Sequence, residues 1–167
     1  RNAFRYAGVL ESAYLIDDMT VEIIADGVHL PKPLLQFVYK FKGPDKTALC
    51  TDSMRGAGMP DGESILGSLE KGQKVLLEDG VAKLLDRTAF AGSTATADRL
   101  VRTMINVAEV SLLDTIKMMT LTPAKIMKID DKKGSIRKGK DADLVIFDKD
   151  IRVLTTIIEG NVIYNAK

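Results

Sequence analysis

Two short apolar segments with a helix-forming segment between them restrict the fold of this chain more than any other feature. Residues 20–25 are rich in β-branched side chains and are bounded by turn-forming residues, which predicts a buried strand. Residues 47–50 predict a second strand. A helix is expected between them, opened by Pro31 and Pro33 and ended by Gly43. Strand, helix and strand follow one another within about thirty residues, the size of one βαβ unit. The sequence therefore predicts an α/β fold.

Polar side chains follow both predicted strands at their carboxyl ends. His29 comes shortly after the first strand, and Asp52 comes directly after the second. In α/β barrels the catalytic groups lie at the C-terminal ends of the strands, whereas the layers below them are packing. Asp52 is therefore a candidate catalytic residue, and His29 is a candidate binding residue. The competing interpretations are that Asp52 caps a turn and that His29 is a solvated or capping residue.

The middle of the chain predicts a loop, a hairpin and several helices. The glycine-rich residues 56–62 are interpreted as a mobile active-site loop. Asp79-Gly80 between two apolar runs is a strong signal for a β-hairpin, at about residues 73–86. Ser93 or Thr94 is expected to be the N-cap of a helix. Further along, Ser111 with Asp114 forms the pattern of a capping box, which predicts another helix.

The last part of the chain changes character. Three apolar segments separated by turn residues predict three strands, at residues 143–147, 153–158 and 162–164. Alternating strands and helices followed by a purely β tail indicate two structural layers or domains. We place the boundary at residue 134, so that residues 1–133 form the first part and residues 134–167 form the second.

Composition excludes several classes of partner. The chain has 167 residues, 46% of them hydrophobic and 28% charged, with a net charge of +1, so we expect neither a nucleic acid nor an anionic membrane as partner. A single cysteine rules out an internal disulfide and fits a reducing compartment, so we expect a cytoplasmic protein. The sequence begins with Arg1 rather than Met, which suggests a piece of a longer protein.

Five motifs in a fixed order resemble a known family. Together they are similar to the C-terminal half of the N-acetylglucosamine-6-phosphate deacetylase family, within the amidohydrolase superfamily, and the resemblance covers essentially the whole chain. The motifs are Asp26-Gly27-Val28-His29, Thr51-Asp52-Ser53-Met54 with Ala57-Gly58, Ala91-Gly92-Ser93, Thr122-Pro123-Ala124, and residues 134–145. The last motif is common to many amidohydrolases, whereas the first two point to the deacetylases.

The resemblance implies roles for individual residues. Asp52 matches the catalytic aspartate at the end of the eighth barrel strand, and His29 matches the substrate-contacting histidine after the seventh. Arg5 resembles an arginine that binds the sugar phosphate, in some members from the neighbouring subunit; its other interpretation is a surface arginine. Phe90-Ala91-Gly92 matches a loop that lies over the substrate. The chain departs from the family at Ala7, where the phosphate motif has proline.

The resemblance also implies a larger assembly. A (β/α)8 barrel needs about 250 residues, so residues 1–133 would be the C-terminal part of a TIM-like catalytic barrel, and residues 134–167 would be strands of a small β-sandwich domain. The family's metal ligands, a glutamate and two histidines, are expected upstream of this sequence and would hold a divalent metal ion, zinc or iron. The expected partners are a phosphorylated amino-sugar substrate, the remainder of the chain, and a second copy in a homodimer.

Amide hydrolysis fits the candidate residues. A carboxylate at the position of Asp52 can take a proton from water and pass it to the departing nitrogen, while a metal ion activates the water and the carbonyl. His29 can contact either the carbonyl or the sugar phosphate. The leading hypothesis is release of acetate from N-acetylglucosamine 6-phosphate. The alternatives are another amidohydrolase, such as a cyclic-amide hydrolase or a deaminase, and a fragment that only binds or assembles.

Overall fold

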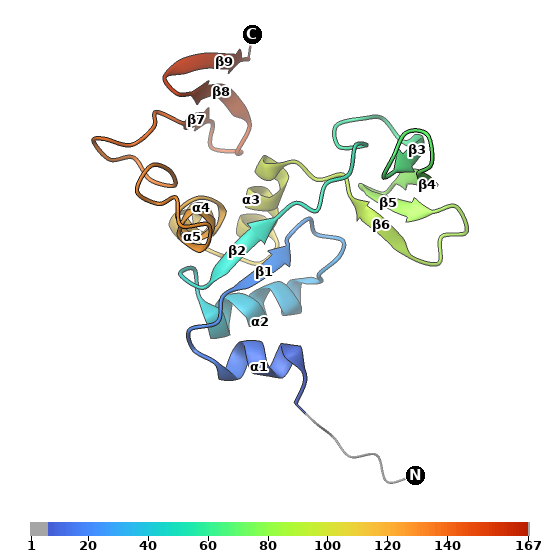
Figure 1. Cartoon of the computed structure of the whole chain (residues 1–167), viewed down its shortest axis with the longest axis horizontal. Helices are drawn as coiled ribbons and strands as arrows, with labels where there is room; N and C mark the ends of the chain where they lie inside the picture. The colour runs from blue at the N-terminus through green and yellow to red at the C-terminus, as the bar shows by residue number, and fades with distance from the viewer. Residues whose placement is uncertain (1–6, 167) are drawn as a thin grey trace.

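The computed structural model describes residues 7–166, and a parallel βαβ unit lies at its centre (Figure 1). Strand β1 (Val21–Ile24) pairs in parallel with β2 (Thr47–Cys50), and helix α2 (Lys32–Lys42) connects them. The helix begins after Pro31 and ends at Gly43, whose φ of 67° suits glycine. The predicted βαβ unit is confirmed, and the chain is an α/β protein.

Four more helices surround this unit. They are α1 (Val9–Leu15), α3 (Ala97–Asn106), α4 (Leu112–Met119) and α5 (Leu121–Ile126). The Ser111 hydroxyl accepts a hydrogen bond of 3.1 Å from the backbone N–H of Asp114, which confirms Ser111 as the N-cap of α4, while the Asp114 carboxylate accepts from the Tyr39 hydroxyl. The main hydrophobic core joins the two strands to α2, α3 and α4 through Ile23, Ala25, Leu35, Val38, Leu49, Leu100, Met104 and Met118. No helix within residues 7–166 has the length and apolar character needed to cross a bilayer.

The region between β2 and α3 contains more structure than the sequence predicted. The expected hairpin is present as β4 (Gln73–Glu78) and β5 (Val81–Leu84), but β3 (Gly62–Leu66) and β6 (Phe90–Ser93) extend it to a four-stranded antiparallel sheet. This sheet stands to one side of the βαβ unit (Figure 1). A small core of Val75, Leu77, Ala82 and Ala91 holds it together.

The predicted N-cap of α3 is wrong. Ser93 is the last residue of β6, Thr94 lies in the following loop, and α3 begins after Thr96. The hydroxyl of Ser93 donates to the Asp26 carboxylate 67 residues away. Because this contact is between distant segments, the local sequence pattern could not reveal it.

The tail is a separate antiparallel sheet of three strands. They are β7 (Leu144–Phe147), β8 (Val153–Ile158) and β9 (Asn161–Asn165), in the order β7-β8-β9. Glu159 and Gly160, with φ of 50° and 80°, form the turn between β8 and β9. The predicted β tail is confirmed, and Figure 1 shows it apart from the β3–β6 sheet.

Candidate functional site

The site lies where β1 and β2 end side by side. Ile24 and Cys50 are register partners in the parallel pair, so the chain leaves the sheet at the same level in both strands. Two residues further on, each strand is followed by an aspartate, Asp26 after β1 and Asp52 after β2. The two carboxylates have opposite surroundings, because Asp26 is buried and Asp52 is exposed.

Asp26 accepts hydrogen bonds at both carboxylate oxygens. The backbone N–H groups of Val28 and His29 each donate to its Oδ1 at 2.9 Å. On Oδ2 it meets the His29 ring at Nδ1 and the Ser93 hydroxyl, each at 2.8 Å. Burial acts to raise the pKa of Asp26, but these bonds from His29, Val28 and Ser93 outweigh it and hold the pKa below the ordinary aspartate value. Asp26 is therefore a buried carboxylate whose charge is stabilised by four donors.

His29 is largely covered, with 17% of its side chain exposed. Its Nδ1 faces Asp26, so Nε2 is the ring nitrogen left for another partner. The ring also packs against Phe90, with the two ring centroids 4.9 Å apart and the planes at 56°. The structure thus brings the predicted binding histidine together with the first residue of the predicted substrate loop.

Asp52 sits in a backbone conformation that is uncommon for a residue with a side chain, with φ of 48°. Its carbonyl oxygen accepts a hydrogen bond of 2.9 Å from the Ser93 N–H, which attaches the end of β2 to β6. Its carboxylate accepts no hydrogen bond from any group within residues 7–166 and is exposed. This arrangement leaves the Asp52 side chain free to meet a ligand.

Gly92 lets β6 approach Asp52 closely. Its φ is 92°, and a Cβ added to it would lie 3.3 Å from the Asp52 carbonyl oxygen. The backbone at Gly92 therefore favours glycine for two reasons, the left-handed conformation and the short distance to Asp52.

A hollow of about 470 Å³ opens beside Asp52. It is lined by Asp52, Met54, Arg55, Gly67, Ala91 and Gly92, among others. The Ala91 methyl group packs in the small core of the β3–β6 sheet, so at this position the backbone rather than the side chain is available to a ligand.

Most of the predicted site residues come together at this place. Asp52, Ala91 and Gly92 line the same hollow, and Phe90 joins them to His29. Arg5 lies outside the described residues. Sequence reasoning did not identify Asp26 and Ser93 as functional. The three-residue spacing from Asp26 to His29 is visible in the sequence and is typical of a side chain that bonds nearby backbone N–H groups, whereas nothing local indicates Ser93.

Residues 7–166 do not supply a metal centre. Among them, no three side chains of His, Cys, Asp or Glu gather in a way that could hold a metal ion. Asp52 and the Asp26–His29 pair are the acidic and imidazole groups at the strand ends, and Asp26 is already saturated by protein donors. The described residues therefore do not fit a metal ion by themselves.

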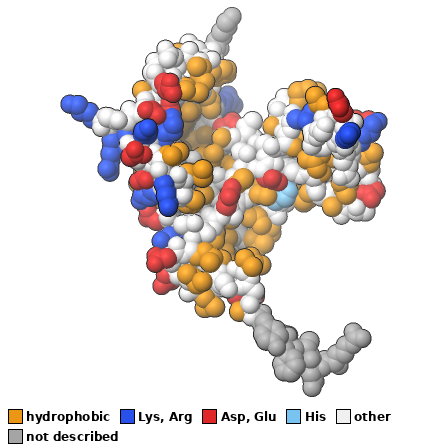
Figure 2. Space-filling view, viewed as in Figure 1, with side chains coloured by type: hydrophobic (Ala, Val, Ile, Leu, Met, Phe, Trp, Pro, Cys, Tyr) orange, Lys and Arg blue, Asp and Glu red, His pale blue; other side chains and the backbone are white. Residues whose placement is uncertain are grey.

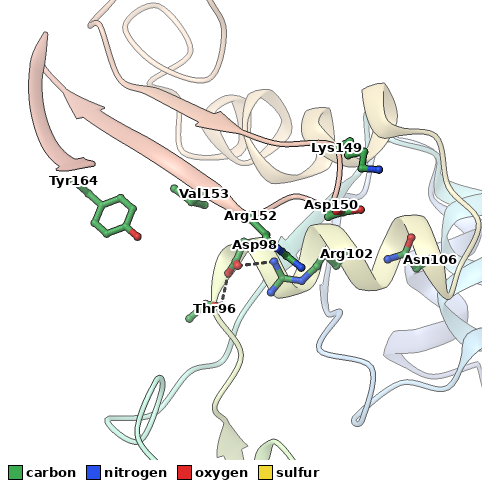
Figure 3. A pocket seen from close by; sticks show the side chains of 9 residues that line it. All are labelled: Thr96, Asp98, Arg102, Asn106, Lys149, Asp150, Arg152, Val153 and Tyr164. Carbon is green, nitrogen blue, oxygen red and sulfur yellow. Dashed lines mark hydrogen bonds and ion pairs between the residues drawn. The ribbon is translucent and has the colours of Figure 1, made fainter. Parts of the chain in front are cut away.

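A larger hollow of about 780 Å³ lies elsewhere, between α3 and the tail (Figure 3). Two of its charged groups, Asp98 and Arg102, pair with each other. Arg102 bonds the Asp98 carboxylate at 2.6 Å and the Ile151 carbonyl at 2.8 Å, and Thr96 also donates to Asp98. Burial acts to raise the pKa of Asp98, but its bonds from Thr96 and Arg102 bring the pKa below the ordinary value. These contacts connect α3 to the tail, so we interpret this hollow as a structural junction.

Comparisons with known proteins find similarity along most of the chain. A model of the amidohydrolase family matches residues 5–163. The chain is 37% identical to N-acetylglucosamine-6-phosphate deacetylase of Bacillus subtilis (strain 168) over 163 residues, 98% of this chain and 40% of that protein. It is 34% identical to N-acetylgalactosamine-6-phosphate deacetylase of Escherichia coli O157:H7 over 140 residues, 84% of this chain and 36% of that protein.

A solved structure is similar along nearly the whole chain. The crystal structure of N-acetylglucosamine-6-phosphate deacetylase from Thermotoga maritima superposes with a TM-score of 0.85 and 35% sequence identity, and the match covers 95% of this chain and 42% of that one. The chain spans about 40% of the length of the first of these relatives.

Proposed function

The chain belongs to the amidohydrolase family, and from that premise we propose that the complete protein is a deacetylase that removes acetate from N-acetylglucosamine 6-phosphate. The observation that carries the proposal is the exposed Asp52 carboxylate, which lies at a strand end, lines a hollow and has Ala91 and Gly92 beside it. The similarity to deacetylases of sugar phosphates supports the choice of substrate.

In the proposed reaction Asp52 moves the proton. Water attacks the carbonyl carbon of the acetamido group while the Asp52 carboxylate takes a proton from that water. The carbon–nitrogen bond of the tetrahedral intermediate then breaks, and Asp52 gives its proton to the departing nitrogen. The products are acetate and glucosamine 6-phosphate. His29 contacts the substrate through Nε2, and Phe90, Ala91 and Gly92, which form a strand rather than the predicted loop, lie over the substrate. Arg5 is proposed to bind the phosphate.

We propose that this chain is the C-terminal part of a larger fold. Strands β1 and β2 would be the seventh and eighth strands of a (β/α)8 barrel formed with the remainder of the chain, with residues 1–133 in that barrel and residues 134–167 in a small β-sandwich domain. Exposed apolar side chains support this arrangement. Val9 and Leu10 of α1 are 85% and 75% exposed, and Figure 2 shows hydrophobic side chains gathered over α1 and α2, a surface that suits burial against more protein.

Three further properties of the complete protein stay predictions. They are a zinc or iron ion held by residues outside this sequence, a homodimer, and a cytoplasmic location. Elemental analysis and the solution mass of the full-length protein would test the first two.

The epimeric substrate, N-acetylgalactosamine 6-phosphate, is a second candidate. The similarity to a deacetylase of that sugar phosphate, at 34% identity, favours it specifically. The two substrates differ only in the configuration at one ring carbon, so the same proton transfer by Asp52 would serve both.

An assay on the full-length protein tests the proposal. We expect acetate release from N-acetylglucosamine 6-phosphate with a higher kcat/KM than from the galactosamine epimer. A higher value for the epimer would favour the second candidate. If the protein opened the ring of a cyclic amide or released ammonia but released no acetate, the proposal would be wrong and another amidohydrolase activity would take its place.

A further inference from the structure

We propose that Asp26 is a positioning residue: its buried carboxylate, itself fixed by Ser93, orients the His29 ring and keeps a proton on Nδ1, so that Nε2 is the nitrogen presented to the substrate. This inference deepens the proposed function, and its kinetic test depends on that function. A second, spectroscopic test does not.

The first step of the argument is the direction of the hydrogen bonds at Asp26. The carboxylate is 1% exposed, and an ionised carboxylate can only accept. The backbone N–H of Ala95 donates to the Ser93 hydroxyl oxygen at 3.0 Å, so the hydroxyl proton is free to point at Asp26. His29 Nδ1, at 2.8 Å from Oδ2, must then donate as well. The tautomer of His29 follows from these contacts.

The second step is the state of the carboxylate. Burial opposes ionisation, yet the four donors lower the pKa of Asp26 below the ordinary aspartate value, so the group is charged near neutral pH. A charged acceptor holds the imidazole N–H more strongly than a neutral one does.

The third step is the orientation of the ring. Asp26 holds Nδ1 on one side, and Phe90 packs against the ring at 4.9 Å between centroids. The Phe90 contact comes from a segment next to the hollow, since Phe90 begins the strand whose Ala91 and Gly92 line it with Asp52. In either protonation state of His29, the atom left for the substrate is Nε2.

Asp26→Asn is the informative substitution because it preserves the shape of the side chain and reverses the direction of its hydrogen bond with His29 Nδ1. The amide oxygen would stay where the N–H groups of Val28 and His29 hold Oδ1. The amide NH₂ would then occupy the Oδ2 position and donate to Nδ1, which moves the imidazole proton to Nε2. The Ser93 hydroxyl can rotate to accept.

A double-mutant cycle in the full-length protein tests whether Asp26 acts through His29. We expect His29→Gln to lower kcat/KM for acetate release by about 10²-fold and Asp26→Asn by about 10-fold to 10²-fold. If Asp26 acts through His29, the double variant loses no more than about twofold beyond His29→Gln, because coupled residues are not additive. Losses that multiply would overturn the proposal and leave Asp26 with a structural role.

Asp98→Asn is the matched control. Asp98 is also a hydrogen-bonded carboxylate that accepts from a hydroxyl and a cationic side chain, but it lies in the other hollow. We expect kcat/KM of Asp98→Asn to equal that of the wild type, and kcat/KM of the double variant with His29→Gln to equal that of His29→Gln alone. Should Asp26→Asn fail to fold, Ser93→Ala replaces it in the cycle, with an expected loss of about threefold to tenfold that disappears when His29 is Gln.

Nitrogen NMR of the full-length protein labelled with ¹⁵N-histidine provides the test that needs no activity. The His29 signals are assigned by their loss in His29→Gln. The wild type should show a proton on Nδ1 from pH 6 to 9, and the neutral ring of Asp26→Asn should carry it on Nε2. An unprotonated Nδ1 in the neutral wild type overturns the inference. If the protein released no acetate from either sugar phosphate, the proposed function would fail while this measurement still decided the role of Asp26.

Discussion

The ends of β1 and β2 lie at the same level of the sheet, but the aspartates that follow them have opposite surroundings. Asp26 and Asp52 each follow a strand by two residues, and the strand ends themselves are register partners. Asp26 is buried and saturated by four donors, whereas Asp52 is exposed in a left-handed conformation, and its carboxylate accepts no hydrogen bond from the part of the chain that the structure describes. Position after a strand therefore does not determine which aspartate can act on a ligand.

Strand β6 contributes to the difference, together with the bonds from Val28 and His29. Ser93 uses its hydroxyl to bond the Asp26 side chain, but it uses its backbone N–H to bond the Asp52 carbonyl. Strand β6 therefore forms a hydrogen bond with the side chain of Asp26 after β1, but only with the main chain of Asp52 after β2. As a result the Asp26 side chain is tied to its surroundings, whereas the Asp52 side chain stays exposed.

The largest effect that this comparison predicts is on turnover by Asp52. In the full-length protein, Asp52→Asn should lower kcat for acetate release by about 10³-fold, since it removes the proton-transferring group. The exposed position predicts a change of no more than about 0.5 kcal/mol in the free energy of unfolding, and the metal content should be unchanged. Asp61→Asn, an exposed aspartate in the following loop, is the control and should keep full activity. Near-normal turnover of Asp52→Asn would contradict the assignment.

The next effect is on stability at Asp26. Asp26→Ala leaves the donors on Ser93, His29 and Val28 without their acceptor inside the protein, so it should lower the free energy of unfolding by about 3 kcal/mol. Asp52→Ala should change it by no more than about 0.5 kcal/mol. Denaturant unfolding of both variants measures the contrast. An equal loss of unfolding free energy in both variants would show that the burial of Asp26 does not make it more important for stability than Asp52.

Acid should lower the stability of the protein through protonation of Asp26. Its pKa is lower in the folded protein than the ordinary value of 3.8, so its charge stabilises the fold above that value, and the contribution is lost as the pH falls through the folded pKa. The stability difference between the wild type and Asp26→Asn should therefore be constant from pH 7 to about 5 and shrink below about 4. Unfolding curves across this range measure it, and a difference that stayed constant down to pH 2 would argue against an ionised Asp26.

A smaller effect is expected where β6 approaches Asp52. Gly92→Ala places a Cβ 3.3 Å from the Asp52 carbonyl oxygen at φ of 92°. We expect a loss of about 1–2 kcal/mol in stability and of about tenfold in kcat because Asp52 is displaced. Gly139→Ala is the matched control, since its φ is 90° with open space around it. Gly139→Ala should lose stability only because of its backbone conformation and should keep its kcat. An equal loss of kcat in Gly139→Ala would show that the effect of Gly92→Ala on activity does not come from the contact with Asp52.

Much of the fold could be read from local patterns. The βαβ unit, the Ser111 cap, the Asp79-Gly80 turn and the three tail strands all depend on residues close together in the chain. Strands β3 and β6 were missed because each is short and lacks a clear apolar alternation, and pairing with the hairpin on either side stabilises them. The same reasoning identified Asp52 and His29 as candidates, because strand ends are recognisable in a sequence.

The sequence by itself determined that two aspartates follow two paired strands, and that His29 lies three residues after the first. Only the tertiary structure decided which aspartate is buried. Part of its environment comes from Ser93, which lies 67 residues away in the chain and donates a hydrogen bond to Asp26. Hydrogen bonds between neighbours in the chain follow from local geometry, but the environment of a carboxylate is set by whatever segment packs over it, and no local pattern specifies that segment.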